Sequence, residues 1–275
     1  MYYRVPVNEV GAAEGRRWNG HILLLYATEQ HRTASVSAWV RSGLAQGDKV
    51  LYAQVPGDLG FLRTLEERGL DVDAATSSGQ LTVLAPDDFY PDSGQEPLVD
   101  RALDEGYPAV RFSAQADLAL SYLSQARHRE VEAGMEELCT TRPVSAMCQY
   151  DAAGSRLSQL VDAVSCHPRL VDHDELRMHQ RDDRLLLEGE ASLVSSTMLE
   201  LALERACTES RTGSLSVDLS GLDFIDVAGC RALLLGTAGF REGGGHLFLE
   251  RPQPHVKRTL RLLGAERLGQ VFLVT

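Results

Sequence analysis

The chain has 275 residues, of which 44% are hydrophobic, which is enough for two domains of ordinary size. Residues 1–175 hold 15 Lys and Arg against 26 Asp and Glu, so they contribute −11 of the formal net charge of −12. Because nucleic-acid phosphates require a basic surface, this balance argues against direct nucleic-acid binding. The five cysteines are widely spaced and include no C-x-x-C pair, so we expect neither disulfides nor a zinc site from them.

The hydropathy pattern of the sequence contains no candidate for a membrane-spanning helix. Every apolar stretch is far shorter than the roughly 20 residues of a spanning helix, and the N-terminal residues lack the pattern of a secretion signal. We therefore expect a cytoplasmic protein without a membrane partner.

In the first part of the chain, predicted strands alternate with predicted helices. Short apolar runs typical of strands buried on both faces occur at 21–26, 49–55, 80–85, 109–113 and 144–150. Helical patterns occupy about 33–47, 57–69, 96–105, 115–140 and 155–166, and the loop 86–95 is expected to be exposed although it contains Phe89 and Tyr90. This alternation predicts an α/β fold with a mainly parallel sheet covered by helices on both faces.

Residues 170–183 are polar and charged and show little apolar periodicity, so we place a domain boundary there. The first domain is expected over 15–170 and a smaller α/β domain over 183–275. In the second domain we predict strands at 185–190, 214–219, 246–250 and 271–274. The predicted helices cover 193–207, from 227 to before 243, and 254–263.

One segment of the second domain carries a recognisable motif. Residues 214–234 read SLSVDLSGLDFIDVAGCRALL, which is a strand, a loop containing Asp223 and Asp226, and a glycine that opens an apolar helix. This arrangement resembles the signature of STAS (anti-sigma-factor-antagonist) domains. The resemblance covers about 183–275 and includes the opening strand 187–190 and the Gly-rich turn 243–245.

The STAS resemblance implies a partner-binding loop. In antagonist-type members this loop reads Asp-Ser-Ser-Gly, and a partner kinase phosphorylates the serine before the glycine at a helix N-terminus, where negative charge is favoured. The matching residues are Asp226, Val227, Ala228 and Gly229, so the hydroxyl is missing. With Asp223, they form the expected contact for an anti-sigma factor or related GHKL-type kinase. The alternative is that Asp226 only caps the helix and Ala228 only packs.

The first domain is similar to the MEDS (DcmR-type sensory) family. The resemblance rests on His21–Tyr26 followed by a helix, on Cys148-Gln-Tyr-Asp151, and on His167-Pro168. It implies a RecA-like α/β module that detects a small hydrocarbon derivative. His21 heads its strand, at the end away from the expected crevice, and is expected to be a hydrogen-bonded core histidine.

The loop that would hold nucleotide phosphates in a RecA-like ATPase corresponds here to residues 27–33. It has no glycine and no lysine, and Glu29 would repel a triphosphate, so we expect neither nucleotide hydrolysis nor a cofactor. The crevice at the carboxyl ends of the strands remains the expected ligand site. The candidate ligand-binding residues there are Tyr26, Glu29, His31 and Gln54.

No residue set in the sequence argues for an enzyme, and no metal site is expected. His167, His173 and His179 recur every six residues, a spacing that does not return to one helix face. The leading hypothesis is a signalling protein in which a sensory domain controls a STAS-like domain and thereby regulates transcription indirectly. The alternatives are a scaffold that assembles as a homo-oligomer through its STAS domains, and an unrecognised enzyme using Glu29 and His31.

Overall fold

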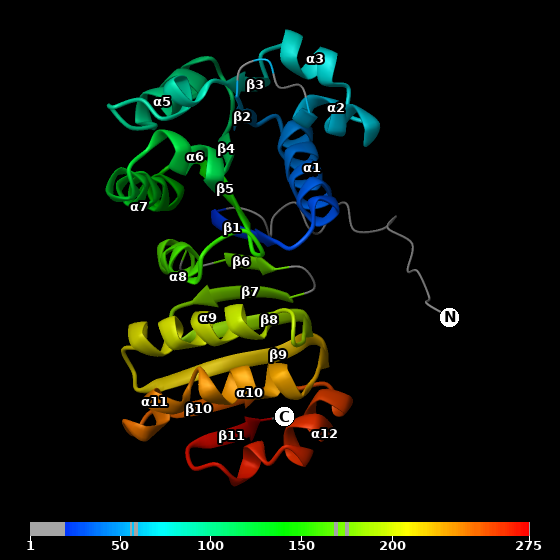
Figure 1. Cartoon of the computed structure of the whole chain (residues 1–275), viewed down its shortest axis with the longest axis vertical. Coiled ribbons are helices and arrows are strands. Elements are labelled where there is room, and N and C mark those ends of the chain that lie inside the picture. Colours follow the sequence, from blue (N-terminus) through cyan, green and yellow to red (C-terminus); the bar gives the residue numbers. More distant parts are fainter. Residues whose placement is uncertain (1–19, 56, 58–59, 168–169, 174–175, 275) are drawn as a thin grey trace. The chain divides into compact units, whose positions relative to one another are not determined.

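The computed structural model describes residues 20–274, apart from 56, 58–59, 168–169 and 174–175 (Figure 1). The chain forms two compact units, which for the described residues are 20–22 with 28–151 and 23–27 with 152–274. Among the described residues, no helix is both long enough and apolar enough to cross a membrane.

The first unit contains a parallel sheet. Its strands follow the order β5 (Val144–Asp151), β4 (Val110–Gln115), β2 (Lys49–Ala53) and β3 (Leu81–Leu84), and each neighbouring pair runs in parallel. Parallel neighbours need crossover connections, and the helices between these strands provide them. β1 (His21–Tyr26) is divided, since its first two residues belong to this unit and the rest to the second.

Helices cover both faces of this sheet (Figure 1). One side carries α1 (Glu29–Gln46), α2 (Gly60–Glu67) and α3 (Val72–Ser77), and the other carries α5 (Glu96–Asp104), α6 (Ala116–Tyr122) and α7 (Gln125–Thr141). Two helix predictions need correction. The expected single helix over 115–140 is two helices, because Leu123 is extended and Ser124 caps a new helix by accepting a hydrogen bond from the Arg127 N–H. In addition, α1 begins before Thr33, because Thr28 caps it.

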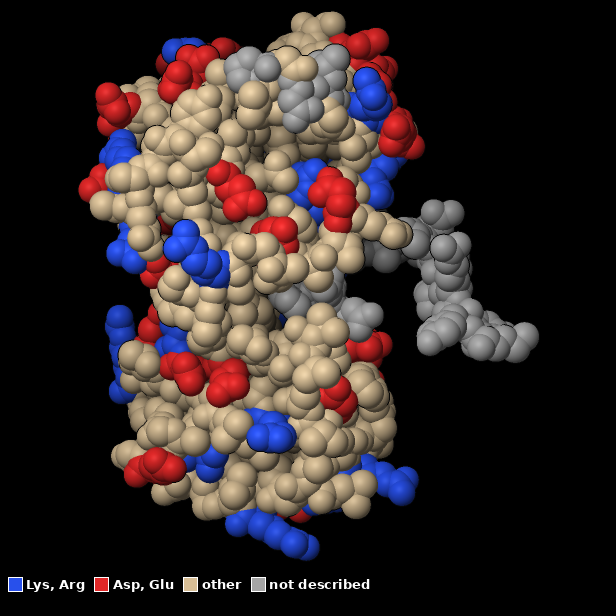
Figure 2. Space-filling model, viewed as in Figure 1, with Lys and Arg blue, Asp and Glu red and all other residues tan. Residues whose placement is uncertain are grey.

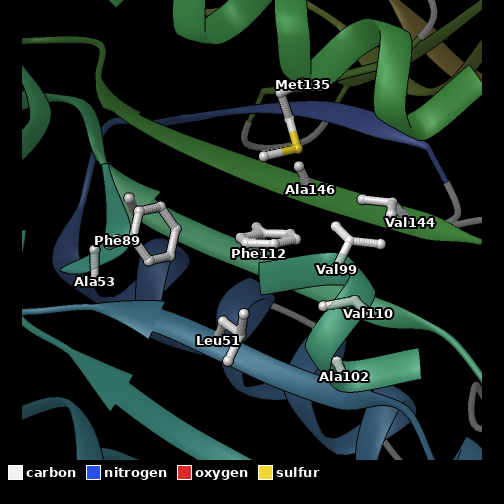
Figure 3. Close-up of a cluster of buried hydrophobic side chains, with 11 residues drawn as sticks. Leu51, Ala53, Phe89, Val99, Ala102, Val110, Phe112, Met135, Val144 and Ala146 are labelled. Carbon is white, nitrogen blue, oxygen red and sulfur yellow. The ribbon is translucent and has the colours of Figure 1, made fainter. Parts of the chain in front are cut away.

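One hydrophobic cluster of the first unit lies between the sheet and the side that carries α4 (Pro86–Phe89), α5 and α7 (Figure 3). Phe112 on β4 packs edge-on against Phe89, with ring centroids 5.7 Å apart. The prediction that the loop 86–95 exposes its aromatic residues is therefore wrong at Phe89, which is buried in the short helix α4. Burial of this ring removes a large apolar surface from water and fixes the loop against the sheet.

The second unit contains a mixed sheet in the strand order β11 (Val271–Val274), β10 (His246–Glu250), β9 (Ser214–Ile225), β8 (Arg184–Ala191), β7 (Leu176–Arg181) and β6 (Leu170–His173). The strands β8 to β11 pair in parallel, and β6 to β8 pair antiparallel. The segment predicted as a polar boundary is thus occupied by two strands. On β7, Leu176 and Met178 are buried and alternate with the more exposed Arg177 and His179, a period-2 pattern that the high charge conceals.

Helices α9 (Ser196–Glu209) and α10 (Val227–Leu235) lie side by side along the strands β8 and β9 (Figure 1). The remaining helices are α8 (Leu157–Cys166), α11 (Ala238–Glu242) and α12 (Pro254–Leu262). The predicted fold class is confirmed: the first unit is a parallel sheet covered by helices, and a smaller α/β domain follows it. The described part of the face in Figure 2 mixes Asp and Glu side chains with Lys and Arg.

Candidate functional sites

Asp226 connects two loops at the start of α10. Its Oδ1 accepts a hydrogen bond from the Gly229 N–H at 2.8 Å, which makes it the N-cap of the helix. Its Oδ2 accepts a second bond from the Leu193 N–H at 3.0 Å, in the loop that follows β8. One carboxylate therefore satisfies donors from both loops and holds the loop after β8 against the helix start.

Gly229 is required by close packing. A Cβ at this position would lie 2.7 Å from the carbonyl carbon of Ala191 and 3.0 Å from its Cβ, and still closer to its carbonyl oxygen. Because β-carbons do not approach backbone atoms this closely, only glycine lets α10 start so near β8. The glycine of the motif thus has a structural role in placing the loop.

Four large apolar side chains are exposed around the start of α10. They are Leu193 (73% exposed), Val194 (64%), Phe224 (45%) and Val227 (57%), and we call them the α10 apolar patch. Leu193 and Val194 precede α9, so the prediction that this helix begins at residue 193 is wrong. Of this patch, only Val227 is among the partner residues predicted from the sequence, although Phe224 lies in the same motif.

Ala228 and Asp223, two other predicted partner residues, lie in different settings. Ala228 is half-buried in the first turn of α10. Asp223 is exposed, but it belongs to β9, which extends to Ile225 instead of ending at Leu219. The carbonyl oxygen of Asp223 accepts a hydrogen bond from His255 Nε2 at 2.6 Å, so Asp223 also connects β9 to α12.

A polar network lies at the carboxyl edge of the sheet in the first unit. Arg32 on α1 donates to Glu29 at 2.8 Å, to Gln149 at 2.9 Å and to the Tyr52 hydroxyl at 3.4 Å. Gln149 in turn donates to the Ser113 hydroxyl at 2.8 Å. Burial lowers the pKa of Arg32, but the hydrogen bond to Glu29 and the neighbouring groups raise it above its ordinary value, so the guanidinium stays charged.

The structure only partly assembles the predicted ligand residues. Glu29 belongs to the network, His31 is half-buried on α1, Gln54 is buried after β2, and Tyr26 lies in the part of β1 that belongs to the second unit. Arg32 was missed by the sequence analysis. The sequence signal for Arg32 is its position three residues after Glu29, which places the two side chains on one face of a helix.

A small cavity of about 30 Å³ lies elsewhere in the first unit. Its wall is mostly apolar and includes Phe89, Phe112 and Met135, together with His128, Glu132 and Cys148. None of the four predicted ligand residues lines it. The sequence could not single out this cavity, because its walls come from β4, β5, α7 and the α4 region.

Comparison with protein families identifies both parts of the chain. The MEDS model, described as the methanogen/methylotroph DcmR sensory domain, matches residues 20–168, and the Mlab STAS domain model matches residues 175–275. The chain belongs to the MEDS family and carries a STAS domain after its sensory domain. No curated protein matches the chain at a significant level.

Several solved structures are similar to parts of the chain. The anti-sigma factor antagonist SpoIIAA in its unphosphorylated form has 14% identity, covers 36% of this chain and 88% of its own, and gives a TM-score of 0.31. A putative anti-sigma factor antagonist from Thermotoga maritima has 18% identity, covers 36% of this chain and 84% of its own, and gives a TM-score of 0.30. A KaiC-like protein from Pyrococcus horikoshii has 14% identity, covers 62% of this chain and 78% of its own, and gives a TM-score of 0.43. A sensory domain followed by a STAS domain is the composition of a signalling or regulatory protein.

Proposed function

We propose that the STAS domain binds a kinase-type anti-sigma factor through the α10 apolar patch and residues 226–229, and so regulates transcription indirectly. Residues 226–229 are the N-cap and first turn of α10, and we keep the name loop for them from the motif. The observation that carries this proposal is the group of four exposed apolar side chains around the start of α10. Exposed apolar side chains that gather around one loop mark protein-binding surfaces, because their burial by a partner releases water. The same loop is where antagonist-type STAS domains are expected to meet their kinase.

The binding is insensitive to phosphorylation at residue 228. A phosphate at this position would add about two negative charges to the docking surface and release the partner. Ala228 offers no oxygen for phosphoryl transfer, so the kinase has no acceptor at this point of the loop. Control therefore passes to the MEDS domain, whose engagement by a signal would alter access to the loop.

The input of the MEDS domain is proposed to be a small apolar solute, with no turnover of that solute. The mostly apolar cavity beside Phe89, Phe112 and Met135 supports this, because it offers contact surface for a small hydrocarbon group. Its volume of about 30 Å³ means that such a solute must displace side chains to enter. A signal of this kind would therefore change the packing of α7 against β4 and β5.

Binding assays with the GHKL-type kinases of the same cell test the output. We expect a purified kinase of this kind to bind the full chain in calorimetry and to remain bound when ATP is added. The Ala228→Ser variant should bind equally well without ATP, gain one phosphate by intact mass, and then be released. If neither the parent chain nor Ala228→Ser binds any of these kinases, the proposal fails.

Peptide mapping distinguishes the loop from other acceptors. Ser220 is a second candidate acceptor, and it lies exposed on β9. A phosphate mapped to Ser220 in the parent chain, together with loss of binding, would contradict insensitivity to phosphorylation while leaving the partner class intact.

A further inference from the structure

Three side chains with metal-binding chemistry meet inside the first unit, although they lie far apart in the sequence. His21 is the first residue of β1, Glu132 lies on α7, and Cys148 lies on β5. His21 and Glu132 are buried, and Cys148 is half-buried. Each offers one ligand atom: Nε2 of the imidazole, Oε2 of the carboxylate and Sγ of the thiol.

The separations of these atoms fit one face of a tetrahedron around a metal ion. Nε2 of His21 lies 3.5 Å from Sγ of Cys148 and 3.1 Å from Oε2 of Glu132, and Sγ lies 3.5 Å from the same Oε2. With ordinary zinc bond lengths, a tetrahedral ion separates nitrogen from sulfur by about 3.6 Å, nitrogen from oxygen by about 3.3 Å, and sulfur from oxygen by about 3.5 Å. All three observed distances lie within about 0.2 Å of those values.

The surrounding groups orient the three side chains as a metal site requires. Nδ1 of His21 lies 3.3 Å from Oε2 of Glu136, so the second nitrogen of the ring faces a carboxylate and Nε2 is left to face the cluster. The other oxygen of Glu132 accepts a hydrogen bond from the Tyr150 hydroxyl at 3.3 Å and lies 3.2 Å from Nε2 of His128. Such outer contacts fix the ligating atoms and are a regular feature of metal sites.

The donor types also suit an ion. An imidazole nitrogen, a carboxylate oxygen and a thiol sulfur are the groups that bind zinc-type ions in proteins. Nitrogen and sulfur donors together select a transition metal of the zinc type over magnesium or calcium, which take oxygen ligands.

We propose that His21, Glu132 and Cys148 bind a divalent transition-metal ion, with zinc as the best fit, inside the MEDS domain. This site is independent of the STAS output proposed above. Glu132 and Cys148 also line the small cavity, so a solute that enters the cavity meets two of the three metal ligands.

Metal substitution in the full chain tests the site. We expect the chain, stripped with a chelator, to take up one Zn²⁺ by elemental analysis. With Co²⁺ it should show a thiolate-to-cobalt charge-transfer band and the intense visible bands of four-coordinate cobalt. The Cys148→Ser variant should lose the charge-transfer band, and Glu132→Gln should weaken Zn²⁺ binding at least as strongly as the ~10-fold loss typical of an outer contact.

A matched control uses another thiol of the same unit. Cys139 on α7 is half-buried and lies outside the cluster, so Cys139→Ser should leave the zinc content and the cobalt spectrum unchanged. Far-ultraviolet circular dichroism of each stripped protein establishes that it is folded. Should Cys148→Ser fail to fold, Glu132→Gln alone decides the test, because glutamine keeps the shape of the side chain.

The proposal is overturned if the folded, stripped parent chain shows no cobalt–thiolate band. It is equally overturned if zinc binding is the same in the parent chain, Cys148→Ser and Glu132→Gln. Either result would leave the cluster as a hydrogen-bonded group of the core.

Discussion

Gly229 at the start of α10 packs directly on the backbone of Ala191 at the end of β8, with no room for a side chain between them. The same two segments are joined by a hydrogen bond from the Asp226 N–H to the Ala191 carbonyl at 3.1 Å. Backbone contact and capping therefore act together to fix the proposed docking loop. The position of the loop depends on this contact more than on helix propensity.

Replacement of Gly229 by alanine is expected to destabilise the STAS domain by about 1–3 kcal/mol, the usual cost of overpacking. In an open helix position the same Gly→Ala change has the opposite effect on stability, because alanine is favoured there by up to about 1 kcal/mol. Gly239 on α11 provides the control, because its Cβ would meet nothing within 4 Å. Urea unfolding with hydrogen exchange of α10 as the local readout measures both variants. Equal stability of Gly229→Ala and Gly239→Ala would refute the packing argument.

A charge placed in the α10 apolar patch should weaken partner binding. Val227→Asp puts a carboxylate where an apolar contact is proposed, and we expect the dissociation constant to rise at least about tenfold, or about 1.4 kcal/mol. Leu235 at the far end of the same helix is similarly exposed (51%), so Leu235→Asp serves as the matched control. Calorimetry of both variants with the same kinase measures the two dissociation constants. Similar losses for the two variants would place the contact elsewhere.

The first unit contains a buried ion pair, and removal of one partner alone should destabilise the unit strongly. Nε of Arg111 lies 2.7 Å from Oδ2 of Asp48, and both side chains are buried, with the guanidinium over the Trp39 ring. Removal of one partner leaves an uncompensated buried charge, so we expect Asp48→Ala to cost about 3–5 kcal/mol. Unfolding monitored by tryptophan fluorescence measures this loss.

An exposed pair on α7 is the control for Asp48→Ala. Nη1 of Arg127 lies 2.9 Å from Oε2 of Glu130, but Glu130 is 65% exposed and Arg127 is only half-buried. Glu130→Ala should therefore cost at most about 1 kcal/mol. If the two alanine variants have the same stability, the buried pair contributes no more than a surface contact.

Asp218 on β9 should make the STAS domain sensitive to acid. Burial raises the pKa of this carboxyl, but hydrogen bonds from Ser220 and the contact with Arg251 outweigh burial, so the pKa lies below its ordinary value of 3.8. Arg184 lies 3.2 Å from the same carboxylate. Because the pKa is depressed by folding, the stabilisation is present above the unfolded value and is lost as the pH falls through the folded value.

Thermal unfolding between pH 3 and pH 6 measures the pH dependence of the stability that Asp218 provides. We expect Asp218→Asn to be less stable than the parent chain near pH 6, with a difference that shrinks as the pH falls below about 4. Glu242, an exposed carboxylate of α11, is the control, and Glu242→Gln should follow the parent chain at every pH. A difference for Asp218→Asn that stays constant with pH would show that its ionisation is not linked to folding.

Local sequence patterns predicted strand and helix limits correctly where buried apolar residues recur at a regular spacing. The apolar runs 21–26, 246–250 and 271–274 are strands with the predicted limits, and Pro254 opens α12 as expected. Local patterns missed the strands β6 and β7 within 170–183. The buried Leu176 and Met178 alternate there with charged and polar neighbours that conceal the period. The predicted domain limits and the identity of the partner stay predictions.

The sequence by itself determined the two α/β domains, the motif Asp226 to Gly229 and the missing hydroxyl at residue 228, because strand periodicity, helix capping and residue chemistry are local properties. Only the tertiary structure decided which side chains meet. It gathered Leu193 and Val194 beside Val227 through the two bonds of Asp226, and it brought His21, Glu132 and Cys148 within 3.5 Å of one another. The physical reason is that parallel strands and their crossover helices place residues far apart in sequence on adjacent elements, and no local pattern encodes that adjacency.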